Sequence, residues 1–171
     1  MPVTKPDNDE YAPYYGTYVS KVPGACALAA LEAQRESTRQ LLATIPEAKA
    51  AFRYAPGKWT VREVIGHLAD AERIFAYRLL RFARNDQAPL ASFDEDSYVP
   101  EGRFEQRSLA DVAAEFTAVR DATLPLVRSL DAETMLRRGT ASGKVMSARA
   151  VAWVIAGHEL HHLGVLRERY L

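Results

Sequence analysis

The sequence predicts an all-α protein, a four-helix bundle, and three observations carry this prediction. Four segments repeat apolar residues at a spacing of three and four, which is the period of an amphipathic helix. The strict alternation typical of strands is nearly missing from the chain. A chain of 171 residues suffices for one hydrophobic core and is too short for two comfortable ones. Four amphipathic segments of about twenty residues in one domain favour a bundle.

The N-terminal segment, residues 1–22, is interpreted as an extended arm because it contains three prolines and four tyrosines. We expect its tyrosines to lie on the body of the protein or on a second subunit. Residues 23–171 are expected to form the single bundle domain. Its first helix is predicted over 24–45, where apolar residues recur on one side.

The second helix is predicted from Thr60 to about Arg84. It opens with Thr60-Val-Arg-Glu63, a capping box in which the Thr hydroxyl accepts a backbone N–H and the Glu carboxylate reaches back. The third helix is expected after Ser108, with a kink or a break at Pro125 because proline cannot donate the helical hydrogen bond.

The fourth helix is expected after Ser147 and runs to about Tyr170. The stretch just before it, 139–147, is interpreted as a turn or a short pair of strands. The segment 85–108 separates the second and third helices. A helix of about 24 residues is about 36 Å long, and this segment is long enough to run beside it from end to end. We therefore favour a crossover with helices two and three parallel, over an up-down bundle with a folded lid.

Three of the four histidines fall inside the stretch GHELHH near the end of the chain. His158 and His162 are separated by one helical turn, so both imidazoles project from one side, on an otherwise apolar stripe. Such a pair on one helix face is a recurrent arrangement for binding a divalent transition metal. His161 projects about 100° away from His162 and is expected to support the site or lie at the surface.

A third ligand has to come from another helix, and His67 is the remaining histidine. It lies beside the apolar stripe of the second helix, where it can face the interior. Three imidazoles would leave positions open for water or substrate, as in catalytic metal sites. The alternative is that these are hydrogen-bonded core histidines, which in a dry interior would each need a partner. The spacing alone leaves both interpretations open.

Two long stretches, HLADAERIFAYRLLRFAR and AGHELHHLGVLRERY, resemble the DinB-like (DinB/YfiT) superfamily of metal-binding bundles. The similarity extends to EYAPYYGTYV, RYAPGKWTVREVIGH and RRGTASG, and so covers nearly the whole chain. The resemblance implies an up-down-down-up four-helix bundle. It also implies one divalent metal on His67, His158 and His162, with zinc or nickel expected first and iron as the further choice. Many members are homodimers, so a homodimer is expected here too.

The resemblance further implies a function, because its best understood members are metal-dependent transferases that use small cytosolic thiols such as bacillithiol or mycothiol. We therefore expect a metal-dependent thiol S-transferase. One alternative is a metallohydrolase with metal-activated water, for which Asp70 and Glu159 are the candidate general bases. Asp70 could instead orient an imidazole, and Glu159 could be a surface charge near Arg167 or Arg169. Another alternative is a non-catalytic, metal-binding stress-response module.

Within the linker, the polar residues Asp94, Glu95, Asp96 and Tyr98 are candidates to line the mouth of the site. A charge-rich linker is otherwise a solvated loop.

Composition excludes several function classes. Lys+Arg and Asp+Glu number 22 each, which argues against nucleic acid and an anionic membrane as partners. No apolar run suggests a signal peptide or a membrane span.

The single cysteine, Cys26, stands among apolar neighbours, so we expect a buried structural thiol. It cannot form an internal disulfide, which fits a reducing compartment, and a cytoplasmic location is therefore expected.

Overall fold

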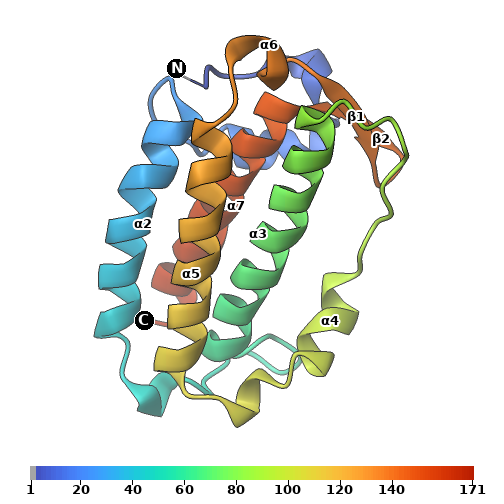
Figure 1. Ribbon diagram of the computed structural model, residues 1–171. Helices are drawn as coiled ribbons and strands as arrows, with labels where there is room; N and C mark the ends of the chain where they lie inside the picture. The colour runs from blue at the N-terminus through green and yellow to red at the C-terminus, as the bar shows by residue number, and fades with distance from the viewer. Residues whose placement is uncertain (1–2) are drawn as a thin grey trace.

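Four long helices lie side by side in the computed structural model, which describes residues 3–171 (Figure 1). These are α2 (Ala27–Thr44), α3 (Val61–Ala83), α5 (Leu109–Arg128) and α7 (Ala148–Arg169). They coincide with the four predicted segments, so the expected helical fold is confirmed. A small two-stranded sheet accompanies the helices and consists of β1 (Arg138–Ala141) and β2 (Lys144–Ser147).

Figure 1 also shows the direction of each helix. Helices α2 and α7 start at the end of the molecule where α6 (Ala132–Met135) lies, and α3 and α5 start at the opposite end. The chain that leaves α3 therefore returns along the side of the molecule before α5 begins. On this path it pairs at Leu90 with β1 and then forms the short helix α4 (Glu95–Glu101).

Three of the four long helices, α3, α5 and α7, begin at a side chain that accepts one of their first free N–H groups. Thr60 accepts a hydrogen bond from the N–H of Glu63, whose carboxylate in turn accepts the N–H of Thr60, so the predicted capping box is confirmed. At the starts of α5 and α7, the hydroxyls of Ser108 and Ser147 accept the N–H groups of Asp111 and Ala150, without a reciprocal carboxylate. Each such cap contributes about 1 kcal/mol to stability.

Two expectations differ from the structure. The arm is not extended throughout, because it contains two 3₁₀ turns, Asn8–Glu10 and Pro13–Tyr15, and a one-turn helix, α1 (Gly16–Val19). Of the two outcomes expected at Pro125, the break does not occur, because α5 continues to Arg128, whereas the kink stays a prediction. A proline near the end of a helix removes only one hydrogen bond, and the last turn is held by side-chain packing.

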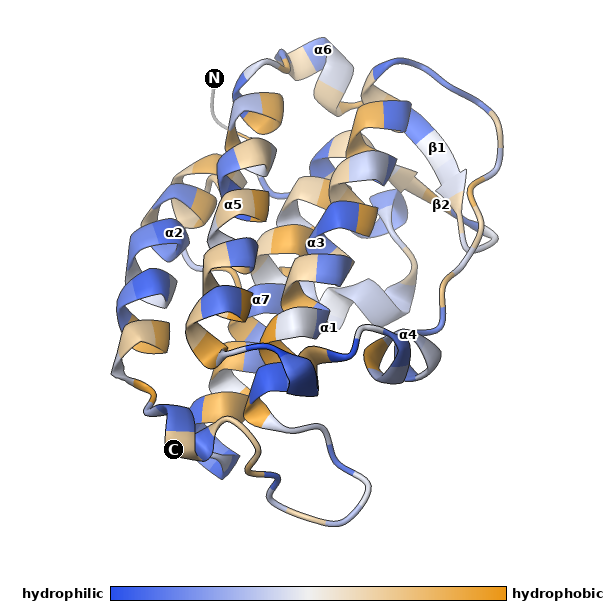
Figure 2. Cartoon of the chain, turned by 60° about the horizontal axis from the view of Figure 1, so that its bottom comes forward, coloured by the Kyte–Doolittle hydropathy of each residue, from blue (hydrophilic) through white to orange (hydrophobic). Residues whose placement is uncertain are grey.

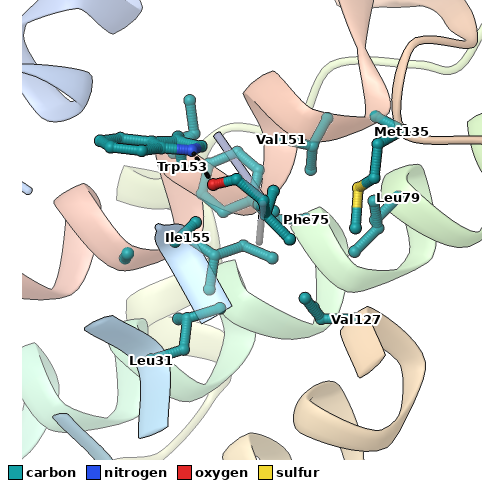
Figure 3. Close-up of a cluster of buried hydrophobic side chains, with 14 of the residues drawn as sticks. Leu31, Phe75, Leu79, Val127, Met135, Val151, Trp153 and Ile155 are labelled. Atoms are coloured by element: carbon teal, nitrogen blue, oxygen red, sulfur yellow. Dashed lines mark hydrogen bonds between the residues drawn. The ribbon is translucent and has the colours of Figure 1, made fainter. Parts of the chain in front are cut away.

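The hydrophobic core has two parts along the bundle. One surrounds Trp153, and Figure 3 shows its side chains converging from α2, α3, α5, α6 and α7. The other lies toward the opposite end and includes Leu68, Phe104 and Leu166. Figure 2 shows hydrophilic residues on the outward side of α2, as expected for a helix with one buried face. Helix α7 is different, since all residues from Ala150 to Glu159 are buried.

The arm is fastened to α7 at two places. The indole N–H of Trp153 donates a hydrogen bond of 3.0 Å to the carbonyl of Val3. The buried carboxylate of Glu10 accepts hydrogen bonds from Arg149 and from the hydroxyl of Ser147. These contacts hold the arm against its own chain.

No helix among residues 3–171 combines the length and apolar character needed to cross a membrane.

Candidate metal centre

The structure brings together the three histidines that the sequence singles out. His67 on α3 faces His158 and His162 on α7, and the Nε2 atoms of His67 and His158 are 3.1 Å apart. One ring nitrogen from each of the three lies within 4.8 Å of the others. Their role as metal ligands stays a prediction, but the required convergence is present.

Burial keeps these imidazoles neutral. Desolvation lowers the pKa of His67 to about 4, and desolvation together with the neighbouring His67 and His161 lowers the pKa of His162 to about 3. The pKa of His158 is also held well below its usual value, first by burial. Neutral imidazoles at pH 7 have the free lone pairs that a metal ion needs.

The donor set fits a divalent transition metal. Within residues 3–171, the four histidine rings make a single hydrogen bond, the one between His67 and His158. Core histidines without a metal would each need polar partners, so the hydrogen-bonded-core interpretation is poorly supported here. Imidazole nitrogen suits zinc, copper, iron and nickel rather than magnesium or calcium, and three ligands leave coordination positions open.

A cavity of about 320 Å³ opens onto the three histidines. Trp59 covers one side, with its ring centroid 4.7 Å from that of His67. Phe75 and Tyr18 flank His158, with centroid distances of 5.6 and 5.4 Å. The floor of the cavity thus consists of imidazoles enclosed by aromatic rings, a setting that limits access of water.

The arm contributes a wall of tyrosines that sequence reasoning did not place at the site. Tyr14, Tyr15 and Tyr18 all line the cavity, and the hydroxyls of Tyr14 and Tyr18 are hydrogen-bonded at 2.9 Å. Burial, and then the hydrogen bond with Tyr14, raises the pKa of Tyr18. Tyr18 therefore stays protonated, and the hydroxyl pair can offer an O–H group to a bound molecule.

Gly157 explains how the arm reaches this place. A Cβ atom added at Gly157 would lie 2.1 Å from the carbonyl oxygen of Tyr18, far inside contact distance. Only glycine lets the backbone of α1 approach α7 so closely, directly beside His158. The glycine of the GHELHH stretch was the signal for this contact.

The opposite wall comes from α3, the crossover and the hairpin. It includes Arg78, Phe93, Glu95 and Ser142. Ser142 has a left-handed backbone conformation (φ 53°) in the hairpin turn, and its hydroxyl accepts a hydrogen bond from Arg78. Arg78 interrupts the apolar stripe of α3 on the face that carries His67, a signal that sequence analysis overlooked.

The linker residues expected at the mouth have different positions. Glu95 lines the histidine cavity, and Asp96 lines a neighbouring cavity that also reaches His161 and His162. Asp94 caps α4 by accepting the N–H of Asp96, and Tyr98 packs on Phe93. His161 lines both cavities, with its ring 5.6 Å from that of Tyr18.

The two carboxylates considered as general bases lie away from the histidine cavity. Glu159 is 1% exposed and bonds to Arg120 and Thr38 inside the bundle, so its interpretation as a surface charge near Arg167 or Arg169 is wrong. Residue 159 points inward because this part of α7, residues 150–159, is buried on all sides.

Asp70 is half-buried and accepts a hydrogen bond from Arg73, and no hydrogen bond joins it to His67 among residues 3–171. Burial is the largest cause of its raised pKa. Neither Asp70 nor Glu159 is among the residues that line the histidine cavity, so their positions do not support either as the base of a hydrolase.

The fold and the site together define a class of protein: a helical bundle with a three-histidine cluster at the floor of an aromatic pocket. A family model described as the DinB superfamily matches residues 30–166. The chain belongs to the DinB superfamily, and the resemblance noted from the sequence is confirmed. None of the curated proteins matches the chain.

Several solved structures share the fold. YfiT from Bacillus subtilis, described as a probable metal-dependent hydrolase with an unusual four-helix bundle topology, superposes with a TM-score of 0.75 at 17% identity, over 96% of this chain and 90% of that one. The mycothiol-dependent maleylpyruvate isomerase gives 0.66 at 13% identity, over 80% of this chain and 58% of that one. A DinB-like protein of Bacillus subtilis gives 0.59 at 18%, over 82% and 86%.

Proposed function

We propose that this protein binds one divalent transition metal through His67, His158 and His162 and catalyses transfer of a small cytosolic thiol to an electrophile. The observation that carries the proposal is the set of three neutral imidazoles at the floor of a cavity that a small molecule can enter. The similarity in fold to a mycothiol-dependent isomerase supports the choice of a thiol. Zinc or nickel is the expected metal, with iron as the further choice, and bacillithiol or mycothiol the expected type of thiol.

The sulfur has to come from outside the protein. Cys26 lies at the start of α2, where its Sγ accepts the N–H of Val3, and it is not among the residues lining the histidine cavity. Its thiol is half-buried and serves the arm rather than the site.

When bound, the metal would favour the thiolate over the thiol and hold its sulfur in place. The side chains around it have complementary tasks. Trp59 and Phe75 exclude water from the sulfur, and the Tyr14–Tyr18 hydroxyl pair can donate a hydrogen bond to the electrophile. In the transfer, a C–S bond forms, the bond to the leaving group breaks, and the thiol proton passes to the leaving group or to buffer.

Hydrolysis is the second candidate, and one observation favours it. Glu95 places a carboxylate on the wall of the same cavity, where it could accept a proton from attacking water. The description of YfiT as a probable metal-dependent hydrolase points the same way. In this case Glu95 takes the role first considered for Asp70 and Glu159.

Cobalt substitution tests the proposal. We expect native mass spectrometry of protein purified without an affinity metal column to show one metal per chain. Adding a small thiol to the cobalt form should produce a sulfur-to-cobalt charge-transfer band. The variant His158→Ala should lose the metal and the band, whereas the matched control His161→Ala and the variant Cys26→Ser should keep both.

Three results would decide against the transferase. Loss of turnover in Cys26→Ser with the metal retained would require a protein thiolate. A cobalt spectrum that thiols never perturb, together with cleavage of esters or amides, would favour the hydrolase. A full metal site without activity toward thiols, electrophiles, esters or amides would favour a non-catalytic stress-response module.

We also propose the finer arrangement of the molecule. The helix directions in Figure 1 support an up-down-down-up bundle with the crossover between α3 and α5. A homodimer is proposed as well, and an apolar groove between α2 and α5, lined by residues such as Leu42 and Ala113, supports it. Light scattering should then give twice the chain mass of 19.0 kDa. A cytoplasmic location follows from the need for a small thiol.

A further inference from the structure

Two buried arginines in this protein have opposite surroundings. Arg120, 1% exposed, lies between the carboxylates of Glu72 and Glu159 at 2.7 and 2.8 Å. Arg78, 2% exposed, has no carboxylate within 4.0 Å among residues 3–171. A buried cation without an anionic partner is costly, and side chains of this kind are retained where a ligand supplies the missing charge.

The partners of Arg78 hold its guanidinium in position but do not neutralise its charge. Its Nη2 group donates to the carbonyl of Ala91 and to the hydroxyl of Ser142, both at 3.0 Å. Its guanidinium lies near the rings of Phe75 and Phe93, with Cζ 5.8 and 5.9 Å from the two centroids. The crossover and the hairpin therefore hold the guanidinium in one place.

The remaining N–H groups of Arg78 have no partner in residues 3–171. Its Nε and Nη1 make no hydrogen bond within the described chain, yet they are not sealed inside it. The sealed side-chain atoms without a partner between residues 3 and 171 are Gln34 Oε1 and Arg62 Nε. Arg78 lines the histidine cavity, so a molecule bound there can supply the acceptor that these N–H groups lack.

The guanidinium lies close to the candidate metal centre. The ring of Phe75 is 5.8 Å from Arg78 Cζ and 5.6 Å from the ring of His158. The cation and the histidine thus lie beside the same aromatic ring and line the same cavity, so a ligand of a few atoms can reach both. Glu95 lines the same cavity, so a singly charged carboxylate fits better than a doubly charged phosphate.

We propose that Arg78 forms an anion subsite that binds a carboxylate of the thiol or of the electrophile while the reactive atom lies at the three histidines. The position of the reactive atom at the three histidines rests on the proposed function, whereas the anion subsite itself does not. The carboxylate is held by a charge-assisted hydrogen bond, which is stronger than a neutral one. The protein therefore selects carboxylate-bearing molecules.

The test compares ω-mercaptocarboxylates of two to six carbons with mercapto-alcohols of the same length, binding to the cobalt form. For at least one length, we expect the carboxylate to bind roughly tenfold or more tightly than the alcohol. This preference should be lost in Arg78→Gln and reduced in Arg78→Lys, which keeps the charge but not the planar donor group. The matched control Arg73→Gln, an exposed arginine of the same helix, should keep the full preference.

A second arm locates the source of the carboxylate. If it belongs to the electrophile, simple alkyl monocarboxylates should bind while a mercapto-alcohol occupies the cobalt, and Arg78→Gln should abolish this binding. Either arm supports the subsite. Where thiols bind the cobalt form, absence of a carboxylate preference in both arms, or persistence of that preference in Arg78→Gln, overturns the subsite.

A readout without metal separates this proposal from the proposed function. Alkyl monocarboxylates should raise the melting temperature of the metal-free wild type, because a ligand that binds only the folded state stabilises it. They should not raise the melting temperature of Arg78→Gln. If Arg78→Gln fails to fold, Arg78→Lys replaces it, and its melting temperature should rise less than that of the wild type. Thiols that leave the cobalt spectrum unchanged would refute the transferase and not the subsite. No thermal shift in the wild type, with no preference in either binding arm, would refute the subsite.

Discussion

Replacing Gly157 by alanine tests whether the arm is held against the histidine cluster as the structure indicates. The added Cβ would lie 2.1 Å from the carbonyl oxygen and 2.4 Å from the carbonyl carbon of Tyr18, whereas ordinary contacts begin at 3.4 Å. Both atoms belong to the backbone, so a change of side-chain rotamer cannot relieve the clash. Helix α1 has to move by about 1 Å or detach from α7.

The magnitude follows from two opposing effects. Alanine in the interior of a helix is more favourable than glycine by about 1 kcal/mol. Overpacking against a fixed backbone costs about 1–3 kcal/mol. If α1 detaches, the burial of Tyr18 and Val19 is also lost, at about 1.5–3 kcal/mol for each large side chain. Subtracting the gain from alanine, we expect a net destabilisation of up to about 2 kcal/mol if α1 moves and of about 2–5 kcal/mol if it detaches.

Gly164 provides the matched control, because it lies on the same helix and a Cβ there would meet nothing within 4 Å. Gly164→Ala should stabilise the protein by up to about 1 kcal/mol. Urea unfolding of both variants gives the two free energies, and trypsin cleavage after Lys21 reports release of the arm. A Gly157→Ala variant as stable as Gly164→Ala, with an uncut arm, would refute the close approach of α1 to α7.

Three further predictions concern charge and metal. Burial favours a raised pKa for Glu10, but hydrogen bonds, first from Arg149, lower it to about 2. Its stabilisation is therefore complete above the ordinary value of 4.5 and is lost as the pH falls toward 2. In urea titrations, the free energy of unfolding of the wild type should fall by up to about 3 kcal/mol more than that of Glu10→Gln over this pH range. An equal pH dependence of the two proteins would contradict this prediction. Arg120→Met should cost about 3–5 kcal/mol of unfolding free energy, because Glu72 and Glu159 remain buried without a cation. Changing all three to apolar residues should recover most of that loss, and a single variant within 1 kcal/mol of the wild type would contradict the reasoning. Chelating the metal should lower the melting temperature but leave the helical circular dichroism, since the apolar core remains; an unfolded metal-free protein would disprove this.

The long helices could be predicted from sequence because each has a local signal. Thr60, Ser108 and Ser147 mark three starts, and the apolar spacing marks the rest. Short elements lacked such signals: α1 and α4 are too short to be stable alone and form because they pack on α7 and α3. The boundary of the arm at residue 22 stays a prediction, and short helical turns interrupt the extended conformation expected for it.

The candidate site was only partly predictable, for a physical reason. The helical spacing of His158 and His162 predicts that they share a face, and the structure agrees. Spacing cannot say what the other faces of a helix contact when that helix is buried all round, as α7 is, so the direction of Glu159 was missed. Tyr18 and Arg78 were missed because they reach the cavity through packing of segments far apart in the sequence.

The pairing at Leu90 has a consequence for how this site can change. Two backbone hydrogen bonds, from Leu90 to Thr140 and from Ser142 to Leu90, join the crossover to the hairpin. These segments form the wall around Arg78 but lie outside the bundle, whereas the histidines project from its two central helices. Lengthening an outer segment costs little loop entropy. New ligand preferences can therefore arise by insertion and exchange in the wall while the metal-binding floor and the core that supports it stay constant.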